Sequence, residues 1–176
     1  MSNKQEKLNA LLRNNFSAFI KKVFQSTSPG GPYQHAWYLD AIAYKLELIR
    51  QGKIRRLIVN LPPRCLKSTA VAIALPAFLH GHDPTLRIIT VSYSSILAEE
   101  HSYQTRLVMC EKWYRDLFPA TILSPDKKTT QMLKTTANGF RFATSTGATI
   151  TGIGADIIII DDLLKPDDAF SDKARG

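Results

Sequence analysis

Residues 56–69 read Arg-Leu-Ile-Val-Asn-Leu-Pro-Pro-Arg-Cys-Leu-Lys-Ser-Thr, a short apolar run followed by two prolines and a polar segment. The apolar run 56–61 predicts a buried β-strand, which the prolines end. The residues from Lys67 to about Leu79 favour a helix, which Pro76 is expected to shorten or kink. The stretch therefore indicates a strand, a loop and a helix in that order, as in α/β folds.

The loop of this unit carries part of a phosphate-binding motif. That motif, G-x-x-x-x-G-K-[ST], needs a lysine that reaches phosphate and a hydroxyl that binds Mg²⁺, both at a helix N-terminus. Lys67 and Ser68 supply these two groups. The two glycine positions fall instead on Leu61 and Leu66, where glycine would permit a positive φ. The match is partial, and an ordinary strand–loop–helix is the alternative.

A second apolar run ends on two carboxylates. Residues 156–160 read Asp-Ile-Ile-Ile-Ile and predict a buried strand, and Asp161 and Asp162 follow it. In nucleotide hydrolases with a phosphate loop, a carboxylate at the tip of a buried strand holds Mg²⁺ together with the loop hydroxyl. Asp161 is placed for that role, and Asp162 for accepting the proton of an attacking water. The alternative is that both aspartates end the strand and cap the next helix.

The rest of the chain completes an alternating pattern of helices and strands. The spacing of apolar residues predicts further helices at 4–25, 35–51 and 95–111, with a Pro/Gly-rich break at 26–32. Further strands are expected at 86–91 and in a hairpin over 129–144 that turns at Asn138-Gly139. These elements predict an α/β fold with a mostly parallel sheet flanked by helices, after an N-terminal helical segment.

Charge and composition narrow the class of protein. Of 176 residues, 23 are Lys or Arg and 15 are Asp or Glu; residues 1–64 hold eleven of the basic and three of the acidic ones. This basic excess, densest at 50–56, favours a polyanionic partner such as nucleic acid, or is simply a solvated face. The two cysteines exclude a disulfide framework, and no apolar run approaches the ~20 residues of a membrane span. We therefore expect a cytoplasmic protein.

Further motifs identify a family resemblance. They are Gly81-His82-Asp83-Pro84, Ser92-Tyr93-Ser94, the glycine- and threonine-rich stretch 147–156, and 158–166. With the two strand ends, they make the chain resemble the N-terminal ATPase region of the large terminase subunit of tailed bacteriophages and prophages, the DNA-packaging motor. The resemblance implies a P-loop NTPase domain over 33–176, incomplete at its C-terminus and without the family's nuclease domain. Residues 1–32 are then a helical segment with a Pro/Gly linker.

The resemblance also implies a site for ATP and Mg²⁺. Lys67 and Ser68 match the phosphate and magnesium contacts, Asp161 matches the magnesium carboxylate, and Asp162 matches the residue that activates water. Arg64 matches an arginine that stabilises charge on the transferring phosphoryl group. The nucleotide-binding loop as a whole is Pro63, Arg64, Cys65, Leu66, Lys67, Ser68 and Thr69. Leu66 departs from the family's usual glycine.

Residues upstream of the loop correspond to the part of the family that contacts adenine. They are Tyr33, Gln34, Trp37 and Tyr38. An aromatic ring or an amide there is suited to stacking on the base or bonding to it, but for Trp37 packing in the core is the favoured interpretation.

The implied activity is hydrolysis of MgATP that drives viral double-stranded DNA into a capsid inside the bacterial host cell. The implied partners are the small terminase subunit, the portal protein and further copies of the chain in a ring. We expect the chain to be a fragment, so turnover by these residues alone is not predicted. The alternatives are a non-catalytic prophage remnant that binds nucleotide or DNA, and a P-loop helicase of another branch.

Overall fold

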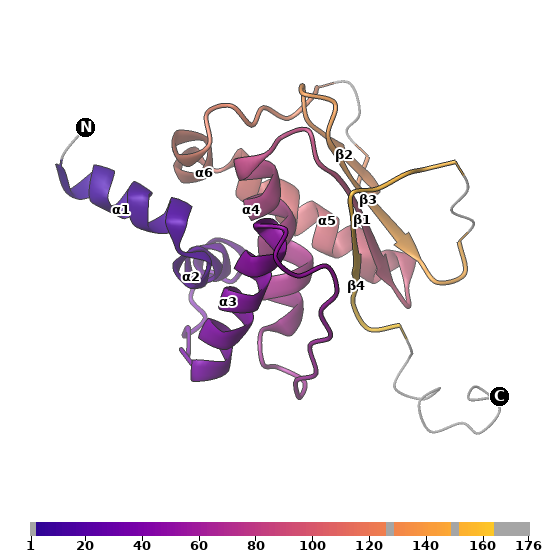
Figure 1. The fold of residues 1–176 in the computed structure, drawn as a ribbon, viewed down its shortest axis with the longest axis horizontal. Helices are drawn as coiled ribbons and strands as arrows, with labels where there is room; N and C mark the ends of the chain where they lie inside the picture. Colours follow the sequence, from indigo (N-terminus) through magenta and orange to yellow (C-terminus); the bar gives the residue numbers. More distant parts are fainter. Residues whose placement is uncertain (1–2, 126–128, 149–151, 164–176) are drawn as a thin grey trace.

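The computed structural model describes residues 3–125, 129–148 and 152–163 (Figure 1). Within them the chain forms an α/β fold, a four-stranded mixed sheet flanked by helices. The elements in chain order are α1 (Asn3–Asn14), α2 (Phe16–Thr27), α3 (Trp37–Arg50), the π-helical η1 (Thr69–Ala74), α4 (Leu75–His82), β1 (Arg87–Ser92), α5 (Ser95–Cys110), α6 (Lys112–Leu117), β2 (Met132–Lys134), β3 (Phe140–Ser145) and β4 (Ile157–Ile160).

The sheet has the order β2-β3-β1-β4 and is mostly parallel, as predicted. β1 pairs in parallel with both β3 and β4, and β2 pairs antiparallel with β3. The predicted hairpin turn is confirmed: Asn138 has a φ of +68°. A Cβ on Gly139 would lie 2.2 Å from the Pro84 carbonyl oxygen, so the turn admits only glycine there.

The predicted strand 56–61 is the main correction. Its alternation holds, because Leu57, Val59 and Leu61 pack against the core while Ile58 is 87% exposed. The segment nevertheless belongs to no strand, and a groove of about 600 Å³ is lined both by it and by β4. Apolar alternation selects which face meets the core, but a strand also needs a neighbour close enough for ladder hydrogen bonds. Among the described residues, this segment has no such neighbour.

Two predicted helices differ in detail from the structure. The helix expected at 4–25 is divided at Asn15, whose side-chain oxygen accepts the Ala18 N–H at 2.8 Å. Asparagine favours this capping role over a helix interior, although the apolar spacing continues on both sides. The helix expected to end near Leu79 runs on to His82, and the π-helical turn η1 precedes Pro76. Pro76 therefore does not interrupt the helix.

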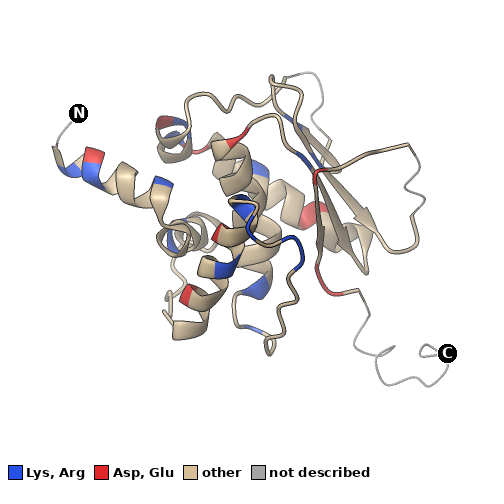
Figure 2. Ribbon diagram, viewed as in Figure 1, with Lys and Arg blue, Asp and Glu red and all other residues tan. Residues whose placement is uncertain are grey.

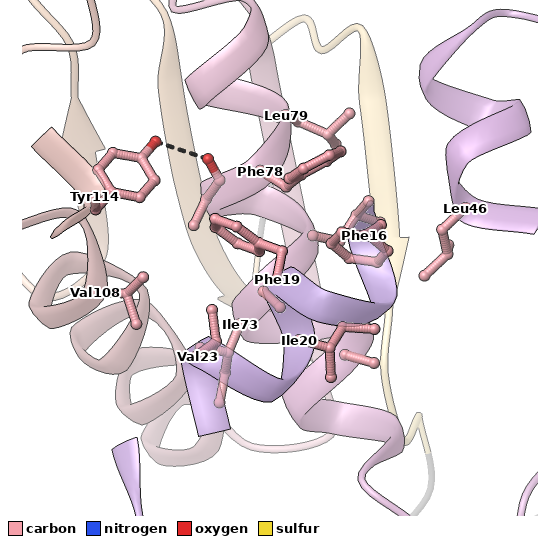
Figure 3. Close-up of a cluster of buried hydrophobic side chains, with 14 of the residues drawn as sticks. Phe16, Phe19, Ile20, Val23, Leu46, Ile73, Phe78, Leu79, Val108 and Tyr114 are labelled. Atoms are coloured by element: carbon pink, nitrogen blue, oxygen red, sulfur yellow. Dashed lines mark hydrogen bonds between the residues drawn. The ribbon is translucent and has the colours of Figure 1, made fainter. Parts of the chain in front are cut away.

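Aromatic side chains cluster with aliphatic ones in the core between the helices (Figure 3). Phe19 and Phe78 have ring centroids 5.1 Å apart and are at most 2% exposed. The Tyr114 hydroxyl donates to the Ala77 carbonyl at 2.7 Å, which satisfies a group whose pKa is raised by burial. A Cβ on Gly81 would lie 2.5 Å from the Phe118 ring, so this contact also requires glycine. Among the described helices, none combines the length and apolarity needed to cross a bilayer.

Candidate functional site

The loop between Leu61 and Thr69 forms a pocket with the end of β4. The pocket has a volume of about 380 Å³ and opens at the N-terminus of the helical run that begins at Lys67. Every residue predicted for the nucleotide-binding loop lines it, and Asp162 joins them from β4. The lining residues are Leu61, Pro62, Pro63, Arg64, Cys65, Leu66, Lys67, Ser68, Thr69 and Asp162. The two motifs found in the sequence therefore meet in space.

The backbone of the loop bends through left-handed conformations. Arg64 has a φ of +64° and Leu66 a φ of +57°, both rare for residues with a side chain. Leu66 stands at the second glycine position of the phosphate-binding motif, so the loop adopts there a conformation that glycine favours. The helical hydrogen bonds begin at once, because the Ala70 N–H donates to the Leu66 carbonyl at 2.9 Å.

This helix start is suited to holding an anion. The N–H groups of Lys67, Ser68 and Thr69 occupy the first turn, where an α-helix has no carbonyl partners to offer them. Such N–H groups, with the positive end of the helix dipole, attract phosphate and carboxylate groups. All three residues line the pocket.

The carboxylates at the end of β4 are held by bonds beyond the strand ladder. The Asp161 N–H donates to the Val91 carbonyl at 2.9 Å, and the Tyr93 N–H donates to the Asp162 carbonyl at 2.8 Å. These bonds keep the ends of β1 and β4 together. The Asp161 side chain is 4% exposed and that of Asp162 is 47% exposed. Asp161 is thus buried and lines the groove beside β4, whereas Asp162 borders the loop pocket.

Lys67 joins the loop to both carboxylates. Its Nζ lies 3.5 Å from Oδ1 of Asp161 and donates a hydrogen bond to Oδ1 of Asp162. Partial burial disfavours the charged amine, but the hydrogen bond to Asp162 and the charges of both carboxylates outweigh it. The pKa of Lys67 therefore lies above its ordinary value. The two aspartates therefore offset the charge of the lysine.

One oxygen of the buried carboxylate lacks a partner. Among the described residues, none forms a hydrogen bond to Oδ2 of Asp161. An unsatisfied buried carboxylate oxygen is costly, and a cation or a bound water is its usual complement. Within the described ranges there is no group of three or more His, Cys, Asp or Glu suited to a metal ion. A divalent ion here would need ligands from the substrate or from water as well, which is the usual coordination of Mg²⁺.

Other predicted residues contribute less to the pocket. Arg64 lies on the exposed part of the loop. Cys65 is half-buried and interacts with Tyr38, whose pKa it raises, so α3 begins beside the loop. The expectation that Trp37 packs in the core is wrong, because its side chain is 80% exposed. As the first residue of α3, it lies on the outward face of the first helical turn.

Sequence reasoning missed two buried basic groups near the site. His101 on α5 is 7% exposed, and burial lowers its pKa, while the charge of Asp161 raises it and that of Arg141 lowers it. Arg141 on β3 is fully buried. No local signal distinguishes them, since a single basic residue in an apolar pattern reads as a solvent-facing position.

The Lys and Arg residues of the segment 50–56 lie at the end of α3 and along the loop that follows it (Figure 2). Arg50 forms a bidentate hydrogen bond with Glu47, which offsets its charge. Lys53, Arg55 and Arg56 are exposed along the loop that leads from α3 to the pocket. The cationic part of this segment is therefore the loop rather than the end of the helix.

A scan against protein-family models gives no match to this chain, and a search of curated proteins gives no significant relative. The stretches 149–151 and 164–176, which carry part of the motifs behind the family resemblance, lie outside the described residues.

Proposed function

We propose that this chain is the ATP-hydrolysing part of a DNA-packaging motor of the large terminase type. The observation that carries the proposal is the convergence of Lys67, Asp161 and Asp162 beside the loop pocket. In the sequence these residues are 94 and 95 positions apart, and an ordinary strand–loop–helix offers no reason for them to meet. The left-handed Leu66 and the helix that starts after it add support.

The residues present fit a nucleotide phosphate group and Mg²⁺. The free N–H groups at Lys67–Thr69 and the lysine amine suit phosphate oxygens. Ser68 and the unsatisfied Oδ2 of Asp161 suit a hard divalent ion, which would neutralise charge on the phosphates when bound. The pocket volume of about 380 Å³ lies within the usual range for ligand sites.

The roles of the chain's own groups follow from their positions. Phosphate would compete with Asp162 for Lys67, since both are anions that the same amine can bind. Asp162, released from the lysine and half exposed, could then accept the proton of an attacking water. Asp161 stays buried beside the lysine, where it would hold the ion. Arg64, on the exposed side of the loop, is free to approach the transferring phosphoryl group.

The partners in the proposal are those of the family. Double-stranded DNA would meet the exposed Lys53, Arg55 and Arg56, whose loop leads into the pocket. The small terminase subunit, the portal protein and a homo-oligomeric ring, all inside the bacterial cell, complete the motor.

The test is calorimetric titration of the chain with MgATP, together with phosphate release. We expect saturable binding that Lys67→Ala abolishes, while Lys53→Ala, an exposed lysine outside the pocket, retains it. Wild-type binding by Lys67→Ala would refute the assignment of the loop. Binding without turnover would favour the non-catalytic alternative, for which the strained Leu66 is the specific argument. Strand separation on a forked duplex would favour the helicase alternative.

A further inference from the structure

Arg141 is the largest fully buried side chain among the described residues. It lies on β3, where it pairs in register with Ile88 of β1 and Leu133 of β2. Burial lowers its pKa to about 9, so the guanidinium remains charged at neutral pH. Within the described part of the chain, no carboxylate forms an ion pair with it, and its Nε and Nη1 have no hydrogen-bond partner.

Among the described residues, Arg141 donates one hydrogen bond, and its acceptor lies in the helix behind the phosphate loop. Its Nη2 donates to the Ala72 carbonyl at 3.2 Å. Ala72 lies in the π-helical turn η1, where the Leu75 N–H donates to Ala70, five residues earlier. In an α-helix the Ala72 carbonyl would accept from residue 76, but Pro76 has no N–H to give. In α-helical register Arg141 therefore supplies the donor that Pro76 lacks, whereas π-helical register pairs this carbonyl with the N–H of residue 77.

A buried charge without a carboxylate partner is a poor way to stabilise a fold. Apolar side chains of similar volume at such positions are often neutral or stabilising. Leucine or methionine at residue 141 would also suit a strand face packed against helices. A guanidinium in this place therefore indicates a function other than stability.

The position of Ala72 connects this bond to the candidate site. It follows Lys67 by five residues in one continuous helical run, and π-helical turns are frequent at functional sites. The charge of Arg141 also acts on His101, on which the charge of Asp161 acts as well. The bond thus joins the β2–β3 hairpin to the helix that presents the phosphate-binding N–H groups.

We propose that Arg141 is a positioning residue that braces the π-helical turn behind the phosphate loop and so sets Lys67 and Ser68 for phosphate binding. The effect of Arg141 on nucleotide affinity rests on the function proposed above, whereas its effect on the stability of the helical turn does not. The bond from Arg141 stands in for an α-helical hydrogen bond from residue 76 to the Ala72 carbonyl. A variant with an N–H at residue 76 should therefore no longer need Arg141.

The experiment compares Arg141→Met, which keeps length and apolar volume without a donor, with Arg141→Lys and with the double variant Pro76→Ala/Arg141→Met. The readouts are MgATP affinity, amide hydrogen exchange of residues 67–75, and the urea midpoint. For Arg141→Met we expect MgATP binding weaker by about tenfold or more, faster exchange at 67–75, and an unchanged or higher midpoint. The lysine variant should be intermediate, and the double variant should regain slow exchange and wild-type affinity.

Three outcomes overturn the proposal: wild-type exchange and affinity in Arg141→Met, an Arg141→Met chain that unfolds, or no recovery in the double variant. Unfolding would show that the fold itself depends on the charge. If the wild-type chain binds no MgATP, the proposed function fails, and hydrogen exchange at 67–75 still decides whether Arg141 braces the helix.

Discussion

The aromatic side of the helical layer and the side that carries the phosphate loop differ in how completely they are packed. Phe16, Phe19 and Phe118 on the first side are at most 4% exposed, and the Phe19 ring packs against the other two. Figure 3 shows Phe16 and Phe19 within this cluster. On the second side, Ile158 and Ile160 of β4 are 63% and 55% exposed. Both regions are apolar in sequence, so composition does not separate them.

This difference indicates where stability and function reside. Apolar burial is the main favourable contribution to folding, so the buried aromatic cluster contributes strongly to stability. The loop 61–69 has few buried contacts and two strained residues, which are properties of segments that open or rearrange locally. We infer that the aromatic side forms a rigid base and that ligand binding acts on the other side.

The largest expected effect contrasts one residue from each region. Phe19→Ala should lower the free energy of unfolding by about 3–5 kcal/mol, because it opens a cavity among rings that are fully buried. Ile158→Ala should change it by no more than about 0.5 kcal/mol, since most of that side chain is already in water. Urea denaturation of both variants measures the contrast. Similar losses of unfolding free energy in the two variants would show that Ile158 is covered in solution. The contrast between a packed side and an open side would then be wrong.

Acid should weaken the packed side through His80. Burial, and to a smaller extent the charge of Arg141, lower its pKa from 6.5 to about 4, while its Nε2 donates to the Leu86 carbonyl. The unfolded chain therefore takes up a proton at a higher pH than the folded one. The free energy of unfolding should therefore be about 3 kcal/mol lower at pH 4 than it is above pH 6.5.

The control for this acid effect is His80→Gln, which keeps a donor toward Leu86 but does not titrate. Urea midpoints of both proteins between pH 7 and pH 4 separate the contribution of His80 from that of the carboxylates. An equal pH dependence in the two proteins would contradict the assignment to His80.

The smallest expected effect concerns strain in the loop. Leucine in the left-handed region costs about 1–2 kcal/mol, and glycine adds about 0.5–1 kcal/mol of unfolded-state entropy. Leu66→Gly should therefore stabilise the chain by up to about 1 kcal/mol and tighten MgATP binding. Leu61→Gly, at the other glycine position but without a positive φ, should destabilise it because Leu61 packs against the core. Calorimetry measures the MgATP affinity of both variants, and urea denaturation measures their stability. A Leu61→Gly variant that is more stable than the wild type would refute the strain argument.

Much of the fold follows from local patterns in the chain. The Asn138-Gly139 turn and the helix after Ser94 appear where the sequence predicts them. The isoleucine run before Asp161 forms the predicted strand, but the expectation that it is buried is wrong, because Ile158 and Ile160 are exposed. Such features need only apolar spacing and turn chemistry, which act over a few residues. The candidates Lys67, Ser68, Asp161 and Asp162 were also identifiable, since each stands at the end of a predicted strand or the start of a predicted helix.

The remainder depends on segments far apart in the chain. Residues 56–61 alternate like a strand but pair with none, because pairing requires a neighbour that local sequence does not specify. Arg141 reads as a surface residue, yet β3 turns it toward η1, where Pro76 has removed a donor. Local sequence is enough to place most helices and strands and to identify the reactive groups. Which strands pair, which charge is buried and that Lys67 reaches both aspartates follow from the tertiary structure, because these depend on contacts between remote residues.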